Sequence, residues 1–271
     1  MPELTREKIV ESCIEGLSFP ESTDFETTIS NLGNIPGPLL HDAFEVLLDD
    51  PDAGLALGVA RAIGLTNCVD AADLAISLVD EPGKWFSHTE RASIRTEAVK
   101  TLGTLKSDTA VSSLLDLVKH TRDQELLMEA ILALGTIASP IAIDPLFDAM
   151  YAWPPVALSA AGALVEIGGV KVLSGFIKAL QSEEDFIRSA SVWALGKIGD
   201  ERAISPLLEL LHDSDRMLKC DIAWALGQIG GFRARLLLLA LAQNDEDLDV
   251  RREASTAVEK GAVLGKYRYD R

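Results

Sequence analysis

Residues 185–215 read DFIRSASVWALGKIGDERAISPLLELLHDSD, and this stretch decides the fold. In its first half the apolar side chains recur at helical spacing, at Ile187, Ala190, Val192, Ala194, Leu195 and Ile198. Gly199 is expected to end that helix, because glycine tolerates the left-handed conformation at a helix end. A second helix is expected from about residue 203 to residue 211, with Pro206 in its first turn, where a missing N–H costs little. The stretch therefore predicts a pair of helices.

The same unit returns along the whole chain. Its mark is a Leu-Gly pair or an equivalent, at Leu32, Ile63, Leu102, Leu134, Leu164, Leu195, Leu226 and Val258. The spacings between successive marks are 31, 39, 32, 30, 31, 31 and 32 residues. Neither helix of a pair can bury its apolar stripe alone, so stacked repeats share one core. The sequence predicts an all-α protein, a right-handed α-solenoid of about seven helical pairs with an N-terminal capping helix.

The unit at residues 185–215 resembles HEAT-like repeats, particularly the short type found in phycobilisome lyase subunits. The matching elements are Ile187-Arg188, Ala194-Leu195-Gly196, Ile198-Gly199-Asp200 and the run from Ala203 to Leu208. The resemblance covers roughly residues 28–261. It implies a non-enzymatic scaffold or adaptor that binds another protein, with the Ala-Leu-Gly helix of each pair on the concave side.

The resemblance also implies an alternative from another functional class. The chain would then be a phycobiliprotein bilin lyase subunit, or a phycobilisome-associated chaperone or degradation factor, with a bilin or a phycobiliprotein as its partner. Because one repeat type serves many roles, the resemblance is specific for the fold and not for the function.

The chain divides into three predicted segments. Residues 1–30 form an N-terminal capping segment, residues 31–261 the HEAT-like array, and residues 262–271 a basic, aromatic C-terminal tail. The 39-residue interval carries an insertion at residues 80–91, in which Trp85 and Phe86 are the large apolar side chains. Two interpretations of this pair stay open. The two side chains pack back on the core, or they form a projecting contact, since solenoid insertions tend to lie in loops on one face.

Helical geometry selects the outward positions of each Ala-Leu-Gly helix, at −6, −2 and +2 from the mark, four residues apart on one face. Trp193 and Trp224 share position −2 in successive repeats. The positions predict a groove with an apolar middle and basic flanks, lined by Arg61, Lys100, Met128, Leu132, Leu158, Trp193, Lys197, Trp224 and Gln228. Tryptophan and arginine are frequent at interaction hot spots. The alternative is that the two tryptophans merely cover small alanine side chains between helices.

A repeated arginine has a structural interpretation. Arg95, Arg188 and Arg251 each lie seven residues before a mark. A charge at a fixed register fits contacts between repeats better than one binding site. We expect each arginine to pair with a turn carboxylate such as Asp200 or to bond a helix-terminal carbonyl.

The composition excludes several classes of function. The chain has 42 acidic and 25 basic residues, and its formal charge of −17 would repel a phosphate backbone, which disfavours nucleic acid. The acidity either keeps the protein soluble or steers a basic partner. The apolar runs are far too short for a membrane span, and the polar N-terminus is not a secretory signal. Three widely separated cysteines predict free thiols and a cytoplasmic location.

The sequence shows no catalytic or metal-binding constellation, so we predict no metal, no cofactor and no enzymatic activity. None of the four histidines has another histidine at i+3 or i+4, and none is followed by glutamate. The deoxyhypusine hydroxylases, a related helical-repeat family, bind two irons through His-Glu pairs, which are missing here. The acidic run at residues 245–249 lacks the glycine and glutamate that an EF-hand requires.

Overall fold

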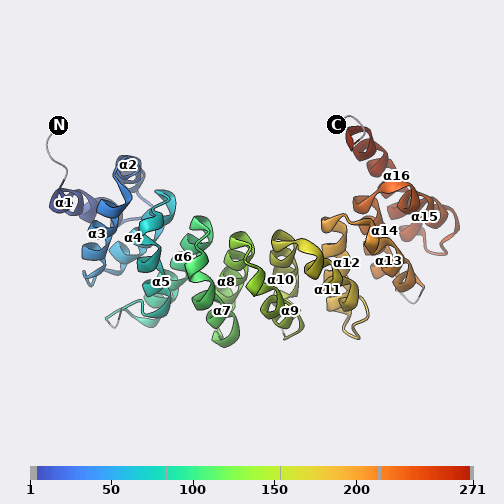
Figure 1. Cartoon of the computed structure of the whole chain (residues 1–271), viewed down its shortest axis with the longest axis horizontal. Coiled ribbons are helices and arrows are strands. Elements are labelled where there is room, and N and C mark those ends of the chain that lie inside the picture. The colour runs from blue at the N-terminus through green and yellow to red at the C-terminus, as the bar shows by residue number, and fades with distance from the viewer. Residues whose placement is uncertain (1–4, 84, 153, 213–214, 269–271) are drawn as a thin grey trace. The chain divides into compact units, whose positions relative to one another are not determined.

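The computed structural model describes residues 5–83, 85–152, 154–212 and 215–268, with side chains in these ranges except at residues 15 and 261–268. Throughout these ranges the regular elements are helices (Figure 1). The chain forms two compact units, residues 1–145 and residues 146–271. The predicted all-α architecture of stacked helical pairs is confirmed. The division at residue 145 was not apparent from the sequence.

The first unit contains helices α1 to α8 and the start of α9. Their bounds are α1 Arg6–Leu17, α2 Thr23–Leu32, α3 Gly37–Leu48, α4 Ala53–Leu65, α5 Ala72–Asp80, α6 His88–Leu105, α7 Val111–His120, α8 Gln124–Ile137 and α9 Ile143–Ala152. Short 3-10 turns at Val69–Ala71, Asp108–Ala110 and Pro140–Ala142 lead into α5, α7 and α9.

The second unit contains the remainder of α9 and helices α10 to α16. Their bounds are α10 Pro154–Ile167, α11 Gly169–Ala179, α12 Asp185–Ile198, α13 Ile204–Leu211, α14 Arg216–Ile229, α15 Gly231–Asn244 and α16 Leu248–Arg268. A 3-10 turn at Glu201–Ala203 precedes α13. Because α16 continues past residue 262, the predicted tail does not begin where the last helix ends. Residues 269–271 lie outside the described residues.

The pair α12–α13 shows why the repeat folds as its sequence indicates. Gly199 ends α12 with φ 69° and ψ 26°, the left-handed conformation expected there. Ile187, Ala194 and Leu195 are buried on the inner face of α12, while Leu207 and Leu211 are buried on α13. The predicted helix boundaries of this pair are therefore correct to within a few residues.

Small residues let the Ala-Leu-Gly helices approach one another closely. A Cβ atom built on Gly103 of α6 would lie 3.0 Å from the Cα atom of Ala133 in α8, and one on Gly196 of α12 would lie 3.0 Å from that of Ala225 in α14. From α4 onward within the first unit, and throughout the second, successive even-numbered helices contact each other extensively, whereas successive odd-numbered helices from α3 onward touch little. The even-numbered helices therefore form the more closely packed layer of each unit.

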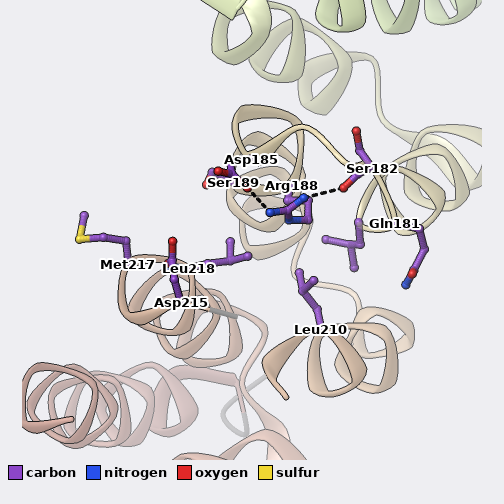
Figure 2. A pocket seen from close by; sticks show the side chains of 10 residues that line it. Gln181, Ser182, Asp185, Arg188, Ser189, Leu210, Asp215, Met217 and Leu218 are labelled. Carbon is purple, nitrogen blue, oxygen red and sulfur yellow. Dashed lines mark hydrogen bonds and ion pairs between the residues drawn. The ribbon is translucent and has the colours of Figure 1, made fainter. Parts of the chain in front are cut away.

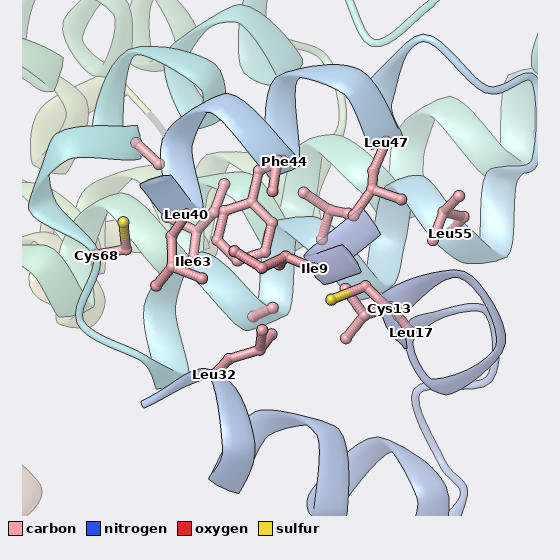
Figure 3. Packing of buried hydrophobic residues seen from close by; sticks show 14 of the residues in the cluster. Ile9, Cys13, Leu17, Leu32, Leu40, Phe44, Leu47, Leu55, Ile63 and Cys68 are labelled. Atoms are coloured by element: carbon pink, nitrogen blue, oxygen red, sulfur yellow. The ribbon is translucent and has the colours of Figure 1, made fainter. Parts of the chain in front are cut away.

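The N-terminal segment caps the first repeat, as predicted. Helix α1 buries Ile9, Cys13 and Leu17 against side chains of α3 and α4 such as Phe44 and Leu55 (Figure 3). Helix α2 adds its own buried side chains to the same cluster. The first predicted mark, Leu32, is the last residue of α2, although this helix lacks the Ala-rich pattern of the later repeats. Its contribution replaces the neighbour that a first repeat does not have.

Candidate partner-binding groove

The second unit has a groove on its even-numbered helices. The groove has a volume of about 370 Å³ and is lined from α10, α12 and α14, by Pro154, Ala157, Leu158, Phe186, Ser189, Ala190, Trp193, Asp221 and Trp224. The structure thus brings together Leu158, Trp193 and Trp224, three of the predicted groove residues. This volume suits one or two side chains of a partner rather than a folded domain.

The helical repeat explains why these side chains meet. Phe186, Ser189 and Trp193 are spaced by three and four residues on α12, so they share one face of that helix. Trp224 occupies the equivalent position on the next even-numbered helix, α14, which packs against α12. Both indoles are half-buried, and Leu158 is 56% exposed. The groove is therefore apolar and open to solvent.

Each tryptophan also lies against a glycine of the preceding even-numbered helix. A Cβ atom on Gly162 would lie 3.8 Å from Cη2 of Trp193, and one on Gly196 would lie 2.7 Å from Cζ3 of Trp224. The indoles thus cover small residues between helices, as the alternative interpretation expected, although the small residues in contact are glycines. Since each ring is only half-buried, the same side chain also lines the groove.

Alanine at these two glycines should change stability with opposite signs. We expect Gly162→Ala to raise the free energy of unfolding by up to about 1 kcal/mol, because the methyl group fits and alanine is the better helix former. Gly196→Ala should lower it by about 1–2 kcal/mol, because the overpacking outweighs that gain. Urea unfolding of both variants measures the difference. Equal changes in the free energy of unfolding for the two variants would contradict the close contact between Trp224 and Gly196.

The groove carries one unpaired carboxylate. Asp221 is half-buried and, among the described residues, its side chain accepts no hydrogen bond and forms no ion pair. Burial raises the pKa of Asp221, and the nearby negative charges of Asp215 and Glu253 raise it further. A cation also borders the groove, since Nζ of Lys197 lies 5.8 Å from the ring centroid of Trp193. The lining of the groove therefore combines aromatic and aliphatic side chains with one carboxylate.

Register reasoning restricted to three positions per helix missed Phe186 and Asp221. Phe186 lies seven residues before Trp193, and Asp221 lies three residues before Trp224. Both spacings place a residue on the same helix face as the tryptophan. A search of every i−3 and i−7 neighbour of the paired tryptophans would have found them.

The predicted groove residues of the first unit make different contacts from those of the second unit. Arg61 lies 3.0 Å from a carboxylate oxygen of Glu21 and 3.5 Å from one of Glu97, and Lys100 lies 3.8 Å from Glu129. The expected basic flank is therefore offset by the chain's own carboxylates. On α8 the predicted Leu132 is 47% exposed and Met128 is half-buried. In the second unit Lys197 and Gln228 are exposed.

The insertion at residues 80–91 separates its two aromatic side chains. Phe86 is 5% exposed, and its carbonyl accepts a hydrogen bond of 3.0 Å from Nε of Arg91. Phe86 therefore packs on the core and is not available as a surface contact. Trp85 is 70% exposed, so the projecting-contact interpretation survives for this residue alone.

A larger cavity of about 520 Å³ lies near the N-terminal ends of α12 and α14 (Figure 2). Arg188 lies in it, donates to the carbonyl oxygens of Ser182 and Glu183 at 2.7 and 2.9 Å, and pairs with Asp185. These bonds hold the turn after α11 against α12, which is a structural role. We therefore do not take this cavity as the candidate site.

The other two repeated arginines act in the same way. Arg95 donates to the carbonyl oxygen of Val79 at 2.7 Å, and Arg251 donates to that of Asp245 at 2.7 Å. The sequence predicted that each arginine pairs with a turn carboxylate or bonds a carbonyl at a helix end. The carbonyl contact is thus confirmed. Asp200 instead pairs with Arg202 at 2.8 Å, and hydrogen bonds from Arg202 lower the pKa of Asp200 to about 2.

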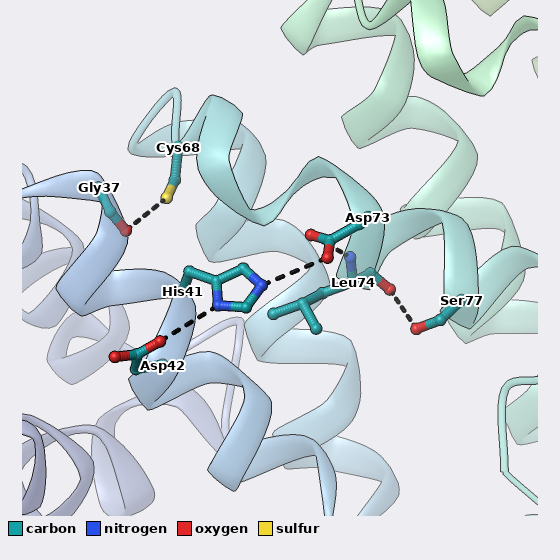
Figure 4. A network of polar contacts seen from close by, with 7 residues as sticks. All are labelled: Gly37, His41, Asp42, Cys68, Asp73, Leu74 and Ser77. Carbon is teal, nitrogen blue, oxygen red and sulfur yellow. Dashed lines mark hydrogen bonds and ion pairs between the residues drawn. The ribbon is translucent and has the colours of Figure 1, made fainter.

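A polar cluster in the first unit joins α3 to α5 (Figure 4). The two ring nitrogens of His41 lie 3.4 Å from carboxylate oxygens of Asp42 and Asp73. Burial lowers the pKa of His41, but the bonds to Asp73 and Asp42 outweigh it, and the net shift is upward. His41, Asp42 and Glu45 could bring three ligand atoms within 4.8 Å of one another. Because both nitrogens already face carboxylates, we assign the cluster to helix packing.

Comparison with known proteins identifies the family of the repeat. A family model of HEAT repeats matches residues 84–164, 152–219 and 173–259, which together cover well over half of the chain. A comparison with curated proteins finds no match. No helix within the described ranges is long and apolar enough to cross a lipid bilayer.

Several solved structures resemble the chain. An archaeal HEAT-like repeat protein from Thermococcus onnurineus is 10% identical with a TM-score of 0.45, over 97% of this chain and 99% of that one. The CpcE–CpcF complex of phycocyanin lyase from Nostoc sp. is 19% identical with a TM-score of 0.43, over 96% and 95%. Human deoxyhypusine hydroxylase is 19% identical with a TM-score of 0.40, over 95% and 97%.

Proposed function

Because the chain belongs to the HEAT-repeat family, we propose that it is a non-enzymatic protein-binding scaffold whose working surface is the groove of Leu158, Trp193 and Trp224. The observation that carries this proposal is the convergence of two half-buried tryptophans and an exposed leucine from three successive even-numbered helices. Exposed apolar surface of this kind is typical of interaction sites.

The packing of the second unit supports this choice of surface. In a curved stack the more closely packed layer lies on the inside, so the even-numbered helices α10, α12 and α14 line the concave side of this unit. A concave apolar surface excludes water from a bound segment, and tryptophan is the residue type most often found to dominate binding energy. In the first unit, taken by itself, Leu132 and Met128 of the even-numbered helix α8 are a second proposed contact surface.

The proposed place of action is the cytoplasm. Cys13, Cys68 and Cys220 are free thiols in the structure, and burial raises the pKa of each. Thiols with a raised pKa are poor nucleophiles and suit a structural role in a reducing compartment.

The test uses the full chain as bait and compares variants. A partner should be retained by the unmodified protein and lost by the Trp193→Ala/Trp224→Ala variant. With that partner purified, each single substitution should weaken binding by about 2 kcal/mol, or about 30-fold in Kd. Calorimetric titration measures the change.

Two further variants decide where the partner binds. Phe232→Ala is the control, because Phe232 is 79% exposed on α15 and does not line the groove. It should leave the Kd unchanged. Normal binding by the double tryptophan variant, together with loss in Trp85→Ala, would move the working surface to the insertion loop. Visible absorbance that copurifies with the chain would instead favour the bilin-related function.

A further inference from the structure

The unpaired carboxylate of Asp221 marks the chemistry of the groove's occupant. It lies on α14, three residues before Trp224, is half-buried, and lines the same groove as Leu158, Phe186 and the two indoles. Its half-buried position removes part of the water around this carboxylate, so a charge-assisted hydrogen bond from a cation would be stronger here than on an open surface. Arg216 and Lys219, the neighbouring cations on α14, are already paired with Asp249 and Asp245.

The two tryptophans of the groove differ in what lies over their rings. Lys197 lies 5.8 Å from the ring centroid of Trp193, whereas no cation among the described residues lies over Trp224. The free indole and the free carboxylate belong to the same turn of α14. Planar guanidinium groups stack on indoles and bond carboxylates through two parallel N–H groups, which a compact ammonium group cannot do.

We propose that the groove binds an arginine side chain of the partner protein, with the guanidinium between Asp221 and Trp224 and an adjoining apolar side chain between Leu158 and Trp193. This inference rests on the proposed function and adds the chemistry of the partner. The charges of the same unit support an arginine at this position, because Asp215 and Glu253 lie near Asp221 and make the local potential more negative. The formal charge of −17 also attracts a basic segment over longer distances.

The proposal is tested with three blocked tripeptides and the ¹⁵N-labelled full chain. The probes are acetyl-Leu-Arg-Leu-amide, the same peptide with citrulline, and the same peptide with lysine. Citrulline keeps the shape of arginine and lacks its charge. The arginine peptide should shift the indole N–H resonances of Trp224 and Trp193, while the citrulline peptide should bind at least tenfold more weakly. The lysine peptide should bind with intermediate strength, because it can pair with Asp221 but cannot stack in the same way.

Matched carboxylate variants show whether Asp221 is responsible. Asp221→Asn preserves the shape of the side chain and should weaken the arginine peptide at least tenfold, so that arginine and citrulline bind alike. Glu166→Gln removes a charge from an exposed position of α10 outside the groove and should change binding less than twofold. An equal loss in both variants would show a net-charge effect and overturn the assignment.

The remaining outcomes separate this inference from the proposed function. Equal binding of the arginine and citrulline peptides, or no shift with any peptide at 10 mM, would overturn the arginine assignment. If the natural partner is lost by the double tryptophan variant but still binds Asp221→Asn normally, the scaffold proposal stands and the arginine site does not. If the partner binds both variants normally, the groove itself is rejected.

Discussion

Leu195→Ala should lower the free energy of unfolding by about 2–5 kcal/mol, the range for large-to-small substitutions in a packed core. Leu195 is 0% exposed on α12, and its even-numbered neighbours α10 and α14 pack closely on that helix. Removing the side chain therefore leaves a cavity that rigid neighbouring helices cannot fill. Urea or thermal unfolding of the two proteins measures the loss.

Trp193→Ala is the matched control for this prediction, because Trp193 lies two residues away on the same helix and is half-buried. It should destabilise the protein clearly less than Leu195→Ala while weakening partner binding. A loss below about 0.5 kcal/mol for Leu195→Ala would be typical of a surface position and would show that the register of the repeat is wrong.

Gly58→Ala should destabilise the protein by about 3 kcal/mol, the upper end of the range for overpacked cores. A Cβ atom on Gly58 of α4 would overlap the carbonyl oxygen of Leu17, the last residue of α1, and would lie 2.8 Å from its carbonyl carbon. Backbone atoms cannot rotate away as a flexible side chain can. The substitution should therefore push the end of α1 away from α4.

Cysteine reactivity gives a local readout of that displacement. Cys13 of α1 is 0% exposed, so its thiol should react with an aromatic disulfide reagent far faster in Gly58→Ala than in the unmodified chain. Gly33→Ala is the control, since its new methyl group would meet nothing closer than 3.7 Å and the backbone there is helical. Unchanged Cys13 reactivity in Gly58→Ala would contradict the close docking of α1 on α4.

The sequence by itself determined the repeat, the helix type and the ends of the pair α12–α13. These features follow from local patterns, such as the apolar period of residues 187–198 and the stop at Gly199. Local patterns also placed Trp193 and Trp224 at one register. Each of these inferences needs only the geometry of a single helix, which is nearly constant.

Only the tertiary structure decided which of the outward side chains line the candidate groove. The period places Arg61 and Trp193 alike on outward faces, yet Arg61 pairs with Glu21 and Glu97, while Trp193 lies with Leu158 and Asp221 around one groove. The tertiary structure likewise buries Phe86 and leaves Trp85 exposed within the same loop. These outcomes depend on distances between segments about 30 residues or more apart. A helical period sets the direction of a side chain, but the packing of neighbouring helices sets what that side chain meets.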